Sequence, residues 1–164
     1  MLFLKSRRNF LKVGFLSSAV IVMSGCDVFA ITTPNHTIEV LQNDLFPKAK
    51  ELKIETANYI NLILRNRYIS DEDKLFLKNG IKWLNETAVE MHGSLYTKLS
   101  LFERQNLLKE ISATKWGESW LYNMMTYIFE AMLGDPIYGS NNEEAGWKWL
   151  NFEGGNPRPK RMYI

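Results

Sequence analysis

Few side chains in this sequence could bind a metal ion or a redox cofactor. Cysteine occurs once, at Cys26, and histidine twice, at His36 and His92. Iron–sulfur and thiolate zinc sites need several cysteines, and mononuclear sites need converging histidines and carboxylates. His36 stands in the polar stretch TTPNHT, which indicates a solvated linker, and His92 precedes Gly93 at a predicted helix end, where the helix dipole favours an imidazole. We therefore expect no metal and no cofactor in this chain.

One group of residues could carry acid–base chemistry, namely Asp135 with Glu143 or Glu144 near Tyr138. Two carboxyl groups in different environments can donate and accept a proton. A self-sufficient enzyme built on them is one hypothesis. However, Asp135 precedes Pro136, and this pair is more simply a turn former. The sequence also lacks a dinucleotide fingerprint, a phosphate loop and a G-x-S-x-G elbow.

The first 26 residues are predicted to be an export leader. Residues 6–12 (SRRNFLK) resemble the twin-arginine signal, whose candidate residues here are Arg7, Arg8, Phe10 and Leu11. The apolar run 13–25 is shorter than the roughly 20 residues of a membrane-spanning helix, which favours a signal peptide. The twin-arginine translocase carries folded proteins, commonly because a cofactor is inserted first. We expect this cargo to hold a cofactor or to accompany a protein that does.

The leader ends in MSGC (residues 23–26), which resembles a bacterial lipobox with Cys26 as the lipidation site. Met23 departs from the more usual Leu, and the alternative is a chance cysteine beside a conventional cleavage site. Asp27 resembles a signal that retains lipoproteins in the inner membrane. The predicted location is the periplasm, in association with the inner membrane. A single cysteine also excludes an intramolecular disulfide.

Composition indicates one globular domain after the leader. The 164 residues are 46% hydrophobic and 13% aromatic. The formal charge is +2, but four of the 20 basic residues and none of the 18 acidic residues precede Cys26, so the remainder carries about −2. Without a basic excess, nucleic acid is not an expected partner.

The remainder is predicted to be all-α, a small bundle of four to five helices. Weak periodicity at Ile38, Leu41 and Leu45 ends at Pro47. Clearer helices are expected over residues 56–65, 70–92, 100–111 and 115–133. The second begins at a Ser70 cap, carries Leu75, Phe76, Ile81 and Leu84 as its apolar residues, and ends at Gly93; the third opens with the capping box Ser100–Glu103.

Helix 115–133 is apolar on more than one stripe, so we expect it to be buried on most sides. The core of a bundle accounts for it better than a cofactor box. Gly134 and Pro136 end it. These features divide the chain into a leader (1–26), a linker with a short first helix (27–47), a helical bundle (48–134) and an irregular C-terminal segment (135–164).

The segment from Gly134 onward is rich in Gly, Pro and aromatic residues, which is poor helix material but too aromatic for a disordered tail. Such a segment folds back on its own bundle or wraps another protein, and the aromatic composition alone favours neither. Because the segment has too little regular backbone hydrogen bonding to hold a core of its own, we expect Trp147 and Trp149 to gain much of their burial from a partner.

Two stretches of this region resemble a known family. EAMLGDPIYGSN (130–141) and GWKWLNFEGGNPRP (146–159) resemble the signature of the gluconate 2-dehydrogenase subunit 3 family, whose members carry Gly-Asp-Pro-x-Tyr-Gly-Gly-Asn and Gly-Trp-Lys elements. The resemblance includes the twin-arginine leader and the helices from about Asp44. It departs at Ser140, where the family usually has a second glycine.

The resemblance implies a small, non-catalytic subunit of a periplasmic, membrane-associated dehydrogenase. In such complexes a large FAD-dependent subunit oxidises gluconate, another sugar acid, a sugar or a polyol, and a cytochrome c subunit with haem often completes the complex. The small subunit carries the export signal for the large one. The predicted interface residues are Asp135, Pro136, Tyr138, Trp147, Trp149 and Phe152. Alternatives are the self-sufficient enzyme above and a lipoprotein that binds sugars on its tryptophans.

Overall fold

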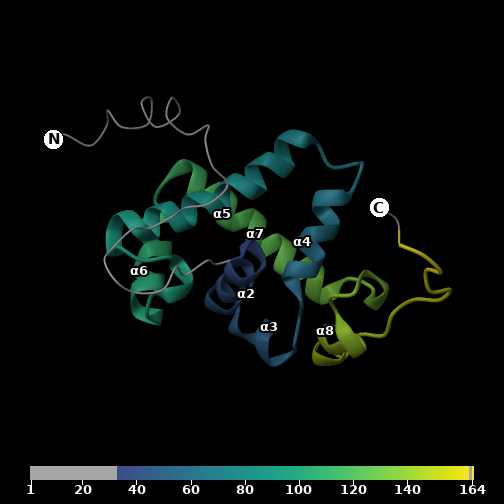
Figure 1. Cartoon of the computed structure of the whole chain (residues 1–164). Helices are drawn as coiled ribbons and strands as arrows, with labels where there is room; N and C mark the ends of the chain where they lie inside the picture. Colours follow the sequence, from purple (N-terminus) through teal and green to yellow (C-terminus); the bar gives the residue numbers. More distant parts are fainter. Residues whose placement is uncertain (1–32, 163) are drawn as a thin grey trace. The chain divides into compact units, whose positions relative to one another are not determined.

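The computed structural model describes residues 33–162 and 164, which form an all-α fold (Figure 1). The leader predictions for Arg7, Arg8, Phe10, Leu11 and Cys26 lie outside these residues. The described helices are α2 (Pro34–Leu45), α3 (Pro47–Glu51), α4 (Thr56–Arg65), α5 (Asp71–His92), α6 (Leu101–Ser112), α7 (Lys115–Leu133) and α8 (Ala145–Trp149), with 3₁₀ turns η1 (Tyr96–Lys98), η2 (Pro136–Tyr138) and η3 (Asn142–Glu144). No strand occurs within 33–162, which confirms the predicted fold class.

Local capping chemistry sets several of the helix ends. The Ser70 hydroxyl accepts the Asp73 backbone N–H at 3.1 Å and begins α5, and Gly93 ends it in the left-handed conformation, with φ of 68°. Ser100 and Glu103 form both halves of a capping box at the start of α6. The predicted ends of both helices are thus confirmed. They could be predicted because each capping signal acts within a single turn.

The first described helix begins earlier than the sequence predicted. The Thr33 hydroxyl accepts the backbone N–H of His36, and Pro34 occupies the first helical turn, where its missing N–H is harmless. His36 is therefore a helical residue with its ring beside Glu39, and the predicted linker through this position is wrong. The expected break at Pro47 is confirmed, since α2 ends at Leu45 and α3 begins at Pro47.

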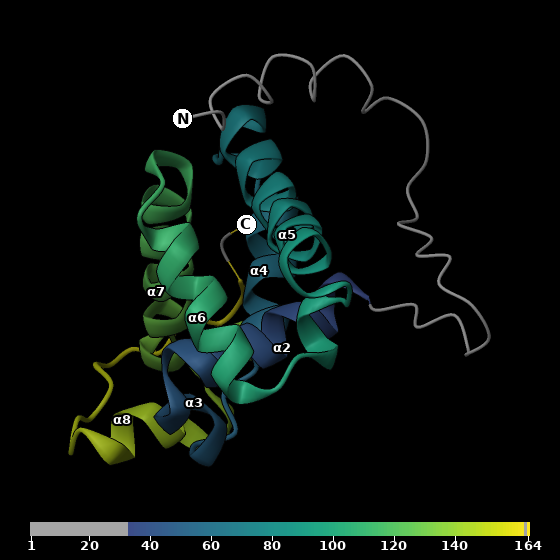
Figure 2. The ribbon, with the colours of Figure 1, turned by 90° about the vertical axis from the view of Figure 1, so that its left-hand side faces the viewer.

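The core lies where α2, α4, α5, α6 and α7 meet (Figure 2). Trp120 of α7 is fully buried there, and its indole Nε1 donates to the Leu77 carbonyl of α5 at 3.3 Å. The ring fits because α5 has a glycine opposite it: a Cβ on Gly80 would lie 2.0 Å from Nε1. Leu75 was expected on the apolar face of this helix, but it is 58% exposed, and Leu77 is buried instead.

A polar cluster joins α2, η1 and α6. Arg104 binds the Asp44 carboxylate with Nε at 2.6 Å and Nη2 at 3.1 Å, and the Tyr96 hydroxyl donates to the same carboxylate at 2.5 Å. Burial, followed by the hydrogen bond to Asp44, raises the pKa of Tyr96 above its ordinary value, so the phenol remains a neutral donor. With its charges paired, the cluster fixes how α2 and α6 pack.

The segment after α7 folds back on the bundle. In Figures 1 and 2, α8 lies beside α3, and a ring contact between Trp149 and Phe46 joins the two regions. Gly134 follows α7 with an ordinary φ of −65°, so its turn needs no left-handed backbone. A glycine is required there for space, since a Cβ would lie 2.7 Å from the Glu130 carbonyl oxygen.

Candidate functional site

A clamp of charged residues holds the two ends of the C-terminal segment together. The Asp135 carboxylate accepts the backbone N–H of Ile137 and Nε of Arg158, both at 2.9 Å, and Arg158 Nη1 also donates to Glu144 at 2.9 Å. Desolvation raises the pKa of Asp135, but the hydrogen bonds from Arg158 and Ile137 outweigh it and leave the pKa below its usual range. Asp135 is therefore a paired carboxylate with a structural role.

Asn141 connects this segment to the end of α7. Its side-chain amide donates to the Gly134 carbonyl at 3.0 Å, and its Oδ1 accepts the backbone N–H of Gly146 at 2.8 Å. Asn141 is only 1% exposed, so both bonds form in a nearly dry environment, where they compensate for polar burial. Gly146 can approach α7 because it lacks a side chain: an added Cβ would lie 2.0 Å from the Met132 carbonyl oxygen.

Position 140 keeps this fit although it is serine. The left-handed residue of the turn is Gly139, with φ of 73°, and Ser140 is outside the set of described residues with positive φ. The Ser140 carbonyl accepts the Glu55 backbone N–H at 3.2 Å, which ties the turn to the start of α4. Its hydroxyl is buried without a hydrogen-bond partner within the described residues. The departure from glycine therefore costs no backbone strain.

Trp147 anchors the segment from inside. It is 7% exposed, and its indole Nε1 donates to the Leu133 carbonyl, an end group of α7, at 2.6 Å. The Arg158 guanidinium lies 4.5 Å from its ring centroid, and the Phe152 ring meets it edge-on at 5.6 Å. The expectation that a partner supplies the burial of Trp147 is wrong, since the chain itself covers this ring.

Trp149 has the opposite surroundings. It is 42% exposed, and its ring packs edge-on against Phe46 at a centroid distance of 6.2 Å. Phe46 in turn lies 5.1 Å from the ring of Phe129 on α7, which is 38% exposed. The half-buried ring of Phe46 therefore lies between two exposed rings, so that three separate parts of the chain contribute to one row.

Helix α7 extends this row along the molecule. Tyr122, Phe129 and Leu133 are spaced by seven and four residues, which places them on one helix face. Tyr122 is 73% and Leu133 40% exposed. We name Tyr122, Phe129, Leu133, Phe46 and Trp149 the exposed aromatic surface. The expectation that α7 is buried on most sides is wrong for this face.

The carboxyl groups proposed for acid–base catalysis, Asp135 with Glu143 or Glu144, are not arranged as a proton donor and acceptor. Asp135 and Glu144 are both bound by Arg158, and Glu143 is exposed on a left-handed turn with φ of 54°. Tyr138 instead lines a shallow hollow of about 240 Å³ with Asn58, Asn61, Leu62, Arg65 and Gly139. The Asn58 and Asn61 amides already donate within the chain, to Glu55 and to Asn35 respectively. The geometry thus brings together no matched acid and base among these residues.

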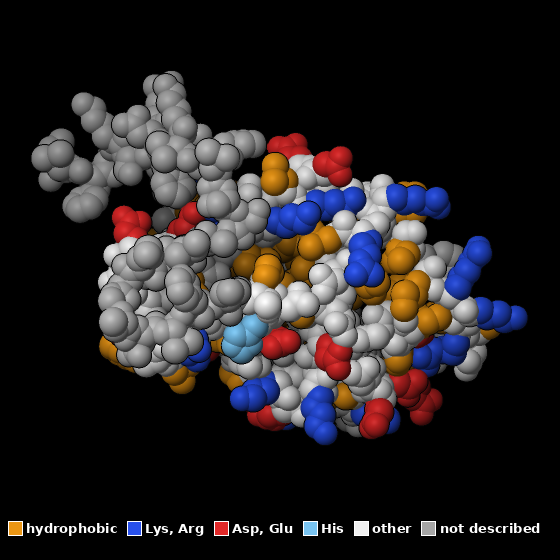
Figure 3. All heavy atoms as spheres, in the orientation of Figure 1, with side chains coloured by type: hydrophobic (Ala, Val, Ile, Leu, Met, Phe, Trp, Pro, Cys, Tyr) orange, Lys and Arg blue, Asp and Glu red, His pale blue; other side chains and the backbone are white. Residues whose placement is uncertain are grey.

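The tryptophans do not form an open platform for a sugar. Trp120 and Trp147 are buried, Trp83 and Trp116 meet edge-on at a centroid distance of 5.1 Å, and the exposed Trp149 packs edge-on against Phe46. Within the described part of the chain, no group of three or more His, Cys, Asp or Glu residues could hold a metal ion. Nor does any helix between residues 33 and 162 have the length and apolar character to cross a membrane. On the face shown in Figure 3, acidic and basic side chains are interspersed.

The six residues predicted as an interface fall into three pairs with different surroundings. Asp135 and Trp147 hold the segment to the bundle, and Pro136 and Tyr138 form a half-buried turn. Trp149 and Phe152 (55% exposed) remain on the surface. Sequence reasoning missed Phe46, Phe129 and Tyr122; the seven-residue spacing of the last two was the signal that could have found them.

Comparison with known proteins gives one match. The family model described as gluconate 2-dehydrogenase subunit 3 matches residues 34–155. The match begins at the first residue of α2 and continues past α8, so it includes the bundle and the docked segment. No curated protein and no solved structure matches the chain.

Proposed function

We propose that this chain, which belongs to the gluconate 2-dehydrogenase subunit 3 family, is the small non-catalytic subunit that exports and stabilises a flavin-dependent dehydrogenase. Family membership makes it a subunit of a multi-subunit dehydrogenase complex. The finer role assigns FAD and substrate oxidation to a large partner subunit, and haem c to a cytochrome subunit where one is present. The substrate is gluconate, another sugar acid, a sugar or a polyol.

The match over residues 34–155 carries this proposal. It is supported by two ion pairs in the C-terminal segment. Arg158 pairs with Asp135 and with Glu144, so both carboxylates stabilise the fold. A chain whose carboxylates hold its own structure together is suited to a binding role. Its mature location would be the periplasm, at the inner membrane, after twin-arginine export of both proteins together.

Purification of the tagged chain from its own bacterium tests this function. We expect a flavoprotein to accompany it from native membranes, with dye-linked oxidation of a sugar, sugar acid or polyol in that fraction. The chain purified alone should have neither flavin absorbance nor activity. Flavin bound to the isolated chain, or activity without a second subunit, would contradict the proposal.

Export is tested separately. Replacing Arg7 and Arg8 with Lys should retain both this chain and the flavoprotein in the cytoplasm, whereas Lys5→Gln, outside the twin-arginine frame, should not. Normal periplasmic dehydrogenase activity in the double variant would contradict the proposed role in export.

Lipidation at Cys26 is tested by a different variant. Cys26→Ala should abolish fatty-acid labelling of the chain, and unchanged labelling would contradict a lipid anchor at this residue.

A further inference from the structure

We infer that the exposed aromatic surface, formed by Tyr122, Phe129, Leu133, Phe46 and Trp149, is where the catalytic flavoprotein subunit binds. Since this rests on the proposed function, it deepens that function by naming the binding surface. The remaining steps concern why this surface, rather than another on the chain, meets the partner subunit.

The first reason is the composition of α7. Its inner face already packs Trp120, Met124 and Ile128 into the core, each fully buried. Its outer face nevertheless carries Tyr122, Phe129 and Leu133, with 73%, 38% and 40% of their surface exposed. Solvent-facing helix positions are ordinarily polar, so a second apolar face on one helix indicates a covering that residues 33–162 do not supply.

The second reason is that the surface is built from segments far apart in sequence and held in fixed positions. Phe46 stands between α2 and α3, Phe129 on α7 and Trp149 on α8. Their planes are tilted by 57° for Phe46–Phe129 and by 65° for Phe46–Trp149. Aromatic rings at fixed angles form ridges and hollows that a shaped protein surface can match, and they dominate binding energy at interfaces.

The third reason is preorganisation. Trp149 belongs to the same short helix as Trp147, whose burial and 2.6 Å hydrogen bond to Leu133 fix that helix against α7. The clamp from Arg158 to Asp135 and Glu144 fixes the chain on both sides of it. Because the ring of Phe46 already packs against those of Phe129 and Trp149, binding loses little side-chain entropy at these three residues. The C-terminal segment thus fixes the position of Trp149 in the exposed aromatic surface.

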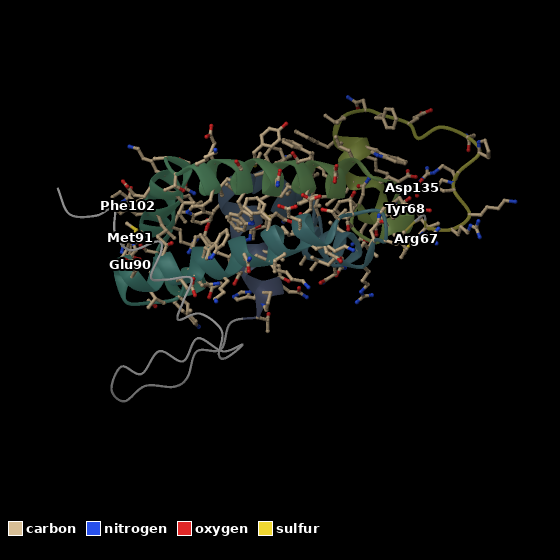
Figure 4. The ribbon with its side chains drawn as sticks, turned by 90° about the horizontal axis from the view of Figure 1, so that it is seen from above. Arg67, Tyr68, Glu90, Met91, Phe102 and Asp135 are labelled. Carbon is tan, nitrogen blue, oxygen red and sulfur yellow. The ribbon has the colours of Figure 1, made fainter. Side chains whose placement is uncertain are left out.

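Other exposed apolar side chains lie elsewhere. Phe102 is 75% exposed, and Figure 4 places it with Met91 and Glu90 at one end of the bundle, whereas Asp135, which follows α7 and Leu133, lies at the other. Phe102 is therefore a matched control: an exposed aromatic ring on a helix, at the opposite end of the bundle from the C-terminal end of α7. A lipid surface or a second copy of the chain are competing occupants of the aromatic surface.

The test uses the flavin-containing subunit purified together with the wild-type chain, separated from it, and titrated with chain variants. We expect Trp149→Ala to weaken binding about thirtyfold, and Tyr122→Ala to weaken it severalfold, while Phe102→Ala leaves it unchanged. Tyr122 is exposed enough that its removal leaves the fold intact, so it keeps the test valid if Trp149→Ala lowers helicity. Circular dichroism of each variant verifies folding.

Different failures have different meanings. If the wild-type chain binds no flavoprotein, the proposed function itself is wrong. If wild type binds and Trp149→Ala and Tyr122→Ala bind equally well, only the assignment of this surface is overturned. The same holds if Phe102→Ala is the damaging variant. Two other outcomes would also overturn the assignment, both with unchanged flavoprotein binding by the Trp149→Ala and Tyr122→Ala variants. If these variants no longer float with phosphatidylglycerol vesicles, the surface binds lipid. If they no longer self-associate in light scattering, the surface binds a second copy of the chain.

Discussion

Trp147 and Trp149 are two residues apart on the same five-residue helix, yet they have opposite surroundings. A helix turns by about 100° per residue, so the two side chains leave α8 on nearly opposite sides. Trp147 points to the end of α7 and is 7% exposed, whereas Trp149 lies against Phe46 and is 42% exposed. Trp147 therefore belongs to the packed interior, and Trp149 belongs to the surface.

The two sides of the C-terminal segment differ in the contacts that they make with the bundle. The inner side provides partners for end groups of α7, since Trp147 and Asn141 donate to the carbonyls of Leu133 and Gly134. The outer side only adds apolar area to a row that is already exposed on α7. Aromatic residues in an irregular segment can therefore serve the fold and an interface at once, and a double substitution of Trp147 and Trp149 would mix the two effects.

The largest expected effect separates the two tryptophans by stability. Trp147→Ala should lower the free energy of unfolding by about 3–5 kcal/mol, because it empties a buried site and leaves the Leu133 carbonyl without its donor. Trp149→Ala, the matched variant on the outer side, should cost less than about 1.5 kcal/mol, because it mainly removes one edge-on ring contact with Phe46. Chemical denaturation of the two single variants measures both values. Equal losses would erase the distinction between the two sides.

A steric change on the inner side should have the next largest effect. Gly146→Ala places a Cβ 2.0 Å from the Met132 carbonyl oxygen, a backbone atom that cannot rotate away. We expect a loss of about 1–3 kcal/mol and faster proteolysis of the C-terminal segment. Gly155→Ala is the control, since nothing lies within 4 Å of its added Cβ. Comparable proteolysis of both variants would mean that close approach at Gly146 does not hold the segment.

The helical part of this picture could be predicted from sequence, and the two-sided segment could not. Ser70, Gly93 and the Ser100–Glu103 box act within one turn of chain, so their residue types determine the outcome. The surroundings of Trp147 and Trp149 depend instead on contacts with Leu133 and with Phe46, the latter 103 positions away. Periodicity cannot encode such distant pairings.

The same limit explains two errors in the bundle. Leu75 has the right spacing for the buried face of α5, but more than half of its surface stays exposed among the described residues. Phe129 and Tyr122 belong to a helix that is apolar enough for burial on most sides to be expected. In both cases residue type gave the tendency to be buried, and only the placement of neighbouring elements decided whether burial occurred.

A smaller effect sharpens the comparison through pH. The pKa of Asp135 is lowered in the folded chain, so its contribution is complete above the ordinary carboxyl value near 4 and disappears as the pH falls through the lower folded value. Asp135→Asn should cost about 1 kcal/mol at pH 7, because the pair with Arg158 is partly exposed. This cost should vanish in strong acid.

Unfolding curves of Asp135→Asn at pH 7 and pH 2.5 provide the measurement. The exposed Glu143 supplies the control, since Glu143→Gln should have little effect at either pH. A cost that persists unchanged at pH 2.5 would show that the ion pair with Arg158 is not its source.

The central claim is that the inner tryptophan is buried by the chain itself and the outer one by the partner subunit. Hydroxyl-radical footprinting, read by mass spectrometry on the isolated chain and on the purified dehydrogenase complex, tests it directly. We predict that Trp147 is protected in both samples, whereas Trp149 is oxidised in the isolated chain and protected in the complex. Oxidation of Trp149 to the same extent in both samples, or of Trp147 in the isolated chain, would contradict the account.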